Sequence, residues 1–300
     1  MSLAAFIMIA LSACSHATWN LLAKKSTMTF AFYTAICLTC TMIWLHTQFW
    51  TAVDVLALPW RFWGFTWLSV ASDMTYLLGL IYAYRKMEIS TAYPMMRALP
   101  LPLTALLTLL FGIGDKLSAL ALAGMAIVFM GCLLIPLKRL SDFSLRNYLN
   151  RSMIFILVVA CGTTGYTLCD KLSQGAMASA VAGLPKPMVA LTYYSTRGIC
   201  LASALLLVTL SVPSIRQDFF DFFRKRNFMP VLAGLFASMT YVLVLLAMNY
   251  VSNVSFVQVF RQIGLIFGVA GGVIFFKESL TLPKLLGMGL IFTGLVISVL

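Results

Sequence analysis

Arg97 and Arg261 are charged residues inside long apolar segments of this sequence, and each has polar neighbours. Tyr93 lies four residues before Arg97, while Gln258 and Gln262 lie on either side of Arg261. A charged side chain at the centre of a lipid bilayer costs roughly 2.5 to 3.5 kcal/mol on insertion scales, so each arginine requires a functional or a structural reason. We expect the two guanidinium groups to hold the negative charge of a small anionic or zwitterionic ligand.

Other polar and aromatic residues share faces of the surrounding apolar segments. His16, Trp19 and Asn20 have the i, i+3, i+4 spacing of neighbours on one helical face. Cationic groups beside aromatic walls are typical of a site for a small polar ligand. The predicted substrate-binding residues are His16, Trp19, Asn20, Tyr76, Tyr93, Arg97, Tyr166, Tyr241, Gln258, Arg261 and Gln262.

His16 and Asp73 are the candidates for proton coupling. An imidazole or a buried carboxyl group can change its protonation when its surroundings change. His16 also has a structural interpretation, because it could donate a hydrogen bond between helices.

Structural interpretations exist for the other polar residues too. Arg97 and Arg261 could be neutralised by Asp73 or by backbone carbonyls, and the aromatic residues could pack or lie at the membrane interface. Arg197 could extend its charge to that interface. The acids beside lysines favour capping or salt bridges at helix junctions. These acids are Asp115, Asp170 and Glu278.

A pattern of one arginine, one acid and two glycines occurs twice. The copies are Arg97, Asp115, Gly124 and Gly131, and then Arg261, Glu278, Gly287 and Gly294. The two halves of the chain are therefore related repeats. Small residues let helix backbones approach, so the glycines predict close packing between the fifth and tenth apolar segments.

The composition is that of a membrane protein. Of 300 residues, 61% are hydrophobic and 10% are charged, which is too apolar for a soluble domain of this size. About 20 apolar residues cross a bilayer, and ten such segments are predicted. They are residues 2–23, 28–48, 60–84, 90–112, 117–137, 151–172, 187–212, 228–250, 253–276 and 280–300. We expect the first to be a retained span rather than a removed signal peptide.

Five segments precede a basic linker and five follow it, so the second half must enter the membrane from the opposite side. We predict an all-α membrane protein of ten transmembrane helices arranged as two inverted five-helix repeats. The repeats are residues 1–137 and 153–300, and the linker is residues 138–152. Together they would form one integrated membrane domain.

Several classes of function are disfavoured. The net charge is +12, but the bases lie in short loops, which favours contact with anionic lipid over nucleic acid. The seven cysteines lie in apolar segments, and the CxxC pair Cys37 and Cys40 is interpreted as packing material. No catalytic or nucleotide-binding motif is present, so we expect no enzyme, no metal and no cofactor.

Three strings of the sequence resemble motifs of one transporter family. His16-Ala17-Thr18-Trp19-Asn20 with Lys24, Tyr93-Pro94-x-x-Arg97, and Arg261-Gln262 through Lys277-Glu278 are similar to those of the EamA-type branch of the drug/metabolite transporter superfamily. The chain departs from the branch at Gln262, where an acid is frequent, and at Asp115-Lys116, where an acid–arginine pair is usual.

The resemblance implies a secondary carrier of a small metabolite, often an exporter, with both termini in the cytoplasm. The charges indicate the opposite orientation, because fourteen bases lie on the side away from the termini and four on the side of the termini.

We therefore expect a multi-pass inner-membrane transporter of an amino-acid-like, zwitterionic or anionic metabolite, working by alternating access. Its partners would be the substrate, the lipid bilayer and, if transport is coupled, protons. An uncoupled facilitator or exchanger and a non-transporting accessory subunit stay open as alternatives, as do a monomer and a homodimer.

Overall fold

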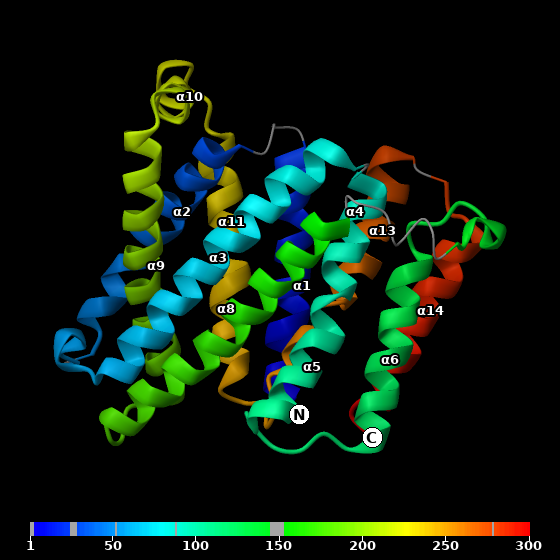
Figure 1. Ribbon diagram of the computed structural model, residues 1–300, viewed down its shortest axis with the longest axis horizontal. Coiled ribbons are helices and arrows are strands. Elements are labelled where there is room, and N and C mark those ends of the chain that lie inside the picture. Colours follow the sequence, from blue (N-terminus) through cyan, green and yellow to red (C-terminus); the bar gives the residue numbers. More distant parts are fainter. Residues whose placement is uncertain (1–2, 25–28, 52, 88, 145–152, 278) are drawn as a thin grey trace.

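The computed structural model of the protein describes the backbone of residues 3–24, 29–51, 53–87, 89–144, 153–277 and 279–300. Within these ranges, the side chains of residues 17, 19–24, 89–91, 272, 275 and 276 are outside the description. All regular structure in the described residues is helical. Figure 1 shows a bundle of tilted helices whose two chain ends both lie at its lower edge.

The α-helices are α1 (Leu3–Lys24), α2 (Phe30–Trp44), α3 (Trp60–Lys86), α4 (Ile89–Ala98), α5 (Pro100–Phe111), α6 (Ala119–Leu134), α8 (Met153–Ala180), α9 (Lys186–Ser211), α10 (Pro213–Arg224), α11 (Met229–Met248), α12 (Ser255–Phe260), α13 (Ile263–Phe276) and α14 (Leu282–Ile297). Short 3₁₀ helices are η1 (Leu45–Phe49), η2 (Val55–Ala57) and η3 (Leu140–Asp142).

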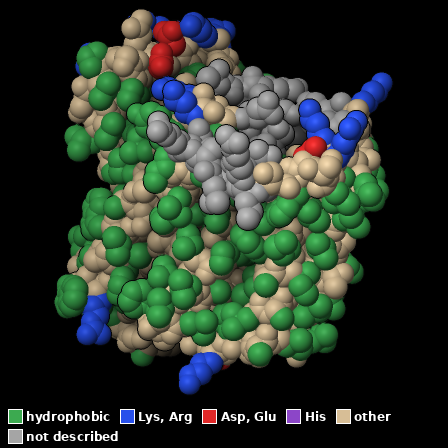
Figure 2. All heavy atoms as spheres, turned by 45° about the vertical axis from the view of Figure 1, so that its right-hand side comes forward, with side chains coloured by type: hydrophobic (Ala, Val, Ile, Leu, Met, Phe, Trp, Pro, Cys, Tyr) green, Lys and Arg blue, Asp and Glu red, His purple; other side chains and the backbone are tan. Residues whose placement is uncertain are grey.

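Five helical segments of the described chain are long and apolar enough to cross a membrane. They are Phe30–Phe49, Ala92–Phe111, Met153–Ala180, Lys186–Ser211 and Met229–Met248. Shorter apolar helices accompany them at Leu3–His16, Ala119–Leu134, Ser255–Gly271 and Leu282–Ile297. Apolar side chains cover the flank of the molecule in Figure 2, while basic side chains gather mainly at one end. The structure is therefore compatible with a membrane protein.

The fourth and ninth predicted segments are each divided into two helices. Leu99 separates α4 from α5, where Pro100 supplies no backbone N–H to continue the first helix. Arg261 and Gln262 separate α12 from α13, and the Gln262 N–H donates to the carbonyl of Val259 at 3.0 Å, the tighter spacing of a 3₁₀ turn. Both divisions fall beside the predicted arginines.

The connection between α9 and α11 contains a helix that was not predicted from the sequence. Residues 213–224 form the helix α10. Its apolar residues are interrupted by Arg216, Asp218 and Asp221, so a search for uninterrupted apolar runs passes over it.

Close packing between the fifth and tenth segments is confirmed by α6 and α14, which lie side by side in Figure 1. A Cβ atom on Gly294 would lie 2.6 Å from the carbonyl oxygen of Gly124, and one on Gly124 would lie 2.5 Å from the backbone nitrogen of Ser298. The backbones therefore touch where the repeated glycines occur. The other extensive helix pairs are α3 with α8 and α1 with α11.

Candidate functional site

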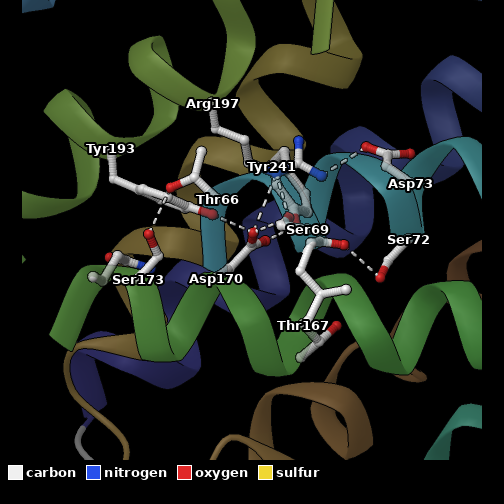
Figure 3. Close-up of polar contacts among 12 residues, drawn as sticks. Thr66, Ser69, Ser72, Asp73, Thr167, Asp170, Ser173, Tyr193, Arg197 and Tyr241 are labelled. Carbon is white, nitrogen blue, oxygen red and sulfur yellow. Dashed lines mark hydrogen bonds and ion pairs between the residues drawn. The ribbon is translucent and has the colours of Figure 1, made fainter. Parts of the chain in front are cut away.

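Arg197 of α9 lies between two buried acids. Its Nη2 is 2.7 Å from Oδ2 of Asp73 on α3, and its Nε is 3.1 Å from Oδ1 of Asp170 on α8. Figure 3 shows the guanidinium between the two carboxylates. All three side chains are buried. Two carboxylates therefore share one guanidinium in the interior of the bundle.

The two acids differ in the number of donors that they receive. Asp170 accepts hydrogen bonds from the hydroxyls of Ser69 at 2.5 Å and Tyr193 at 2.6 Å, from the hydroxyl of Tyr241, and from Nε of Arg197. Asp73 accepts one from Nη2 of Arg197 and one from Tyr33 at 2.9 Å. Among the described residues, Asp170 thus accepts four hydrogen bonds and Asp73 accepts two.

Close approach of α3 and α8 brings these groups together. A Cβ atom at Gly162 would lie 2.6 Å from the backbone nitrogen of Tyr76, so only glycine permits this crossing. Farther along the same contact between the two helices, Ser69 and Asp170 come within hydrogen-bond distance.

Three of the predicted tyrosines form a series of edge-to-face contacts beside the cluster. The ring centroids are 6.0 Å apart for Tyr76 and Tyr166, and 5.8 Å apart for Tyr166 and Tyr241. The guanidinium carbon of Arg197 lies 5.1 Å from the ring centroid of Tyr241 and 5.9 Å from that of Tyr166. This is within cation–π distance.

The two predicted arginines are also adjacent. Nη2 of Arg97 donates to the carbonyl oxygen of Arg261 at 2.9 Å, and its guanidinium lies 6.0 Å from the ring centroid of Tyr93. Among the described residues, neither arginine forms an ion pair. Within the part of the chain that the structure describes, Nε of Arg97, Nη1 of Arg261 and Oε1 of Gln262 are buried without a hydrogen-bond partner. Such atoms are costly when unpaired, so a ligand could satisfy them.

Gln258 and Gln262 support the division between α12 and α13. Gln258 donates from Nε2 to the hydroxyl of Thr167 on α8 at 2.6 Å. Gln262 donates from Nε2 to the carbonyl of Gln258 at 2.9 Å, which leaves its Oε1 unpaired. Of the pair, Gln262 has the free acceptor that a ligand could use.

The predicted α1 residues are only partly described. His16 is half-buried. One turn earlier, the Ala13 carbonyl lies 3.4 Å from the position of a Cβ on Gly264, and Nη2 of Arg97 lies 2.9 Å from the same position. The side chains of Trp19 and Asn20 lie outside the described residues.

Several expectations about acids require correction. Asp73 pairs with Arg197 and not with Arg97 or Arg261. Asp170 forms no ion pair with Lys171, whose Nζ donates to the carbonyl of Met248 instead. Arg197 does not extend to the interface, because it is enclosed between acids and tyrosines.

Asp115 takes part in a junction through its backbone. Its N–H donates to the carbonyl of Ser252 at 3.1 Å, and its carbonyl accepts from Asn253 at 2.9 Å. Glu278 lies outside the described residues.

Sequence reasoning gave no role to Ser69, Tyr33 or Tyr193. It weighed a structural role for Asp170 and Arg197 against a place in the cavity and did not include them in the predicted substrate-binding set. One signal could have identified the ion cluster: Asp73, Asp170 and Arg197 are charges inside three separate predicted apolar segments. Charges in such positions commonly pair with one another. In the part of the chain that the structure describes, no group of three His, Cys, Asp or Glu side chains could hold a metal ion.

Comparison with known proteins identifies the fold but no family. No family model matches the chain, and no curated protein matches it. A solved structure described as "Crystal structure of protein" aligns with 99% of this chain and 96% of its own, with a TM-score of 0.66 and 13% identity. At this identity the similarity concerns the arrangement of the helices alone.

Proposed function

We propose that the chain is a multi-pass transporter of the inner membrane, with ten spans arranged as two inverted repeats. In this interpretation α3 corresponds to α11 and α8 corresponds to α1. The extensive pair α3–α8 then has its counterpart in α11–α1, and α6 packs on its own repeat mate α14. Such exchanged contacts are what a two-fold relation between halves predicts. The resemblance to EamA-type carriers of the drug/metabolite transporter superfamily supports the same proposal.

The observation that carries the proposal is the pair Arg97 and Arg261 with its unpaired donors. Both arginines lie where a predicted span is interrupted, and interrupted spans form ligand sites in secondary transporters. Buried guanidinium N–H groups without an acid would bind the anionic part of a small anionic or zwitterionic metabolite. Tyr76, Tyr166 and Tyr241 would provide aromatic walls.

Of the two proton-coupling candidates, Asp73 is the one whose described contacts suggest a mechanism. It pairs with Arg197, which also pairs with Asp170. Protonation of Asp73 would weaken its pair with Arg197 and alter the contact between α3 and α9. Flux that is unaffected by both Asp73→Asn and His16→Asn would favour an uncoupled facilitator or exchanger.

A thermal-shift screen of the purified protein tests ligand binding directly. The panel contains amino acids, phosphorylated metabolites, nucleobases and quaternary amines, and each hit is repeated with Arg97→Ala and Arg261→Ala. Binding to the folded state raises its stability by mass action. We expect anionic or zwitterionic hits that both variants lose. Arg61→Ala is the control, since Arg61 is an exposed arginine beside Trp60.

Two outcomes would contradict the proposal. Hits retained by both variants would place the ligand elsewhere. If no compound stabilises the parent and both variants are as stable as the parent, the arginines serve no ligand, and the accessory-subunit alternative is favoured. Counterflow of a confirmed hit in proteoliposomes then distinguishes transport from binding alone.

A further inference from the structure

The helix α10 lies across one end of the bundle, between α9 and α11, and Figure 1 views it nearly along its axis. One of its stripes faces the protein. Ile215, Phe219 and Phe222 have i, i+4, i+7 spacing and pack against α2 and its neighbours. The helix is therefore fixed to the bundle and does not cross it.

A second stripe of α10 faces away from the protein. Arg216, Phe220 and Phe223 repeat the i, i+4, i+7 spacing one residue later. Phe220 is 45% exposed and Phe223 is 62% exposed, and Phe228 beyond the helix is 67% exposed. A helix with exposed aromatic residues beside arginines is typical of one that lies in the interface plane of a bilayer.

The positive charge of this region is not neutralised by its own acids. Lys225 and Asp221 form an exposed pair at 2.8 Å, and the hydrogen bond from Lys225 lowers the pKa of Asp221. Among the described residues, Arg216, Arg224 and Arg226 form no ion pair. Three guanidinium groups are therefore available beside the aromatic stripe.

Backbone strain marks the basic residue that follows α10. Arg226 has a φ of 47°, the left-handed conformation in which glycine usually ends a helix. The Asn227 N–H donates to the carbonyl of Phe222, and the Arg226 N–H to that of Phe223, which closes the turn. Lys277, which follows α13, has a φ of 54°. Each of these positions thus carries a basic side chain at a cost in conformational energy.

We propose that α10 and the turn that follows it bind anionic phospholipid, with Phe220 and Phe223 at the acyl boundary and Arg216, Arg224 and Arg226 on the headgroup phosphates. Basic groups near a membrane surface attract anionic lipid, and Figure 2 shows basic side chains gathered at this end of the molecule. A second copy of the chain would bring the same three arginines face to face, which like-charge repulsion opposes. The inference rests on the membrane location in the proposed function.

The test uses the full chain purified in detergent and then reconstituted. Thermal stability is measured with added phosphatidylglycerol or phosphatidylcholine of the same acyl length. The variants are Arg216→Gln/Arg224→Gln and Arg226→Gly, and the charge-matched control is Arg61→Gln/Lys116→Gln at the opposite end. Oligomeric mass is measured for Phe220→Ser/Phe223→Ser.

We expect phosphatidylglycerol to raise the unfolding temperature more than phosphatidylcholine does, and the double variant at α10 to lose at least half of that difference. The control should keep it. The inference would be overturned if the two lipids raised the unfolding temperature of the parent equally, or if the control lost as much of the difference as the α10 variant. It would also be overturned if Phe220→Ser/Phe223→Ser changed the oligomeric mass but kept the response to phosphatidylglycerol. Failure of the parent to enter lipid vesicles at all would instead contradict the membrane location.

Discussion

Because Arg197 is shared by two acids, removing it should lower the free energy of unfolding more than removing the charge of one acid. Arg197→Gln leaves Asp73 and Asp170 buried without a cation. Removing one partner of a buried ion pair costs about 3 to 5 kcal/mol. Asp73→Asn keeps an acceptor for Nη2 of Arg197, so it replaces a charged hydrogen bond with a neutral one and costs about 1 kcal/mol.

The double variant Arg197→Gln/Asp73→Asn separates the cost of an uncompensated carboxylate from the cost of a weakened hydrogen bond. Because it removes one of the two uncompensated carboxylates, we expect it to be more stable than Arg197→Gln alone. Asp170 retains the hydroxyls of Ser69, Tyr193 and Tyr241 in the double variant. The departure from additivity should be about 1 to 3 kcal/mol.

The free energy of unfolding is measured in mixed micelles of mild detergent and dodecyl sulfate, with the thermal midpoint as a second readout. Lys225→Gln is the control, because it breaks the exposed pair with Asp221 and should change stability little. A double variant that is less stable than Arg197→Gln, or costs that simply add, would refute the shared-charge argument.

Three further substitutions have matched controls. Gly264→Ala would place a Cβ atom 2.9 Å from Nη2 of Arg97 and should displace that flexible side chain. We expect this variant to unfold at nearly the temperature of the parent but to lose the stabilisation by anionic hits. Gly268→Ala on the same helix has open space and should retain binding in the thermal-shift screen. Gly294→Ala would force apart the backbones of α6 and α14 and should cost about 1 to 3 kcal/mol, whereas Gly289→Ala on the same helix has open space and should not lower the unfolding temperature. Arg226→Gly should raise stability by about 1 kcal/mol by relieving a left-handed backbone, measured in detergent without added lipid; a decrease would show that the Arg226 side chain stabilises the fold through protein contacts.

Features carried by a single segment or by the repeat could be predicted from the sequence. Ten apolar runs were predicted to span the membrane, and among the described residues five helical segments are long and apolar enough to do so. The repeated glycines identified the contact between α6 and α14. The length of an apolar run shows whether a helix can cross a bilayer, and small residues mark where two helices approach closely. Both signals can be read within one segment or between two copies of a repeat. The helix α10 was missed because its apolar residues alternate with charges over only twelve positions.

Contacts between segments could not be predicted in the same way. Ser69 and Asp170 are 101 residues apart in sequence, and Asp73 and Arg197 are 124 apart. A single sequence does not specify which acid a buried arginine will contact, because several pairings of the same arginines and acids would balance the charges equally well. The crossing of α3 and α8 decides the pairing by placing both acids beside α9.

That pairing also changes the argument for a ligand. The sequence allowed Asp73 to neutralise Arg97 or Arg261, which would have made both arginines structural. In the described structure Asp73 is bound to Arg197, and the two remaining guanidinium groups are left with a carbonyl, aromatic rings and unpaired N–H donors. Neither guanidinium has an acid among the described residues to balance its charge, which is costly in a low-dielectric interior. A bound anion would balance that charge and satisfy the unpaired donors together, so these two arginines are the side chains that the proposed anionic ligand would contact.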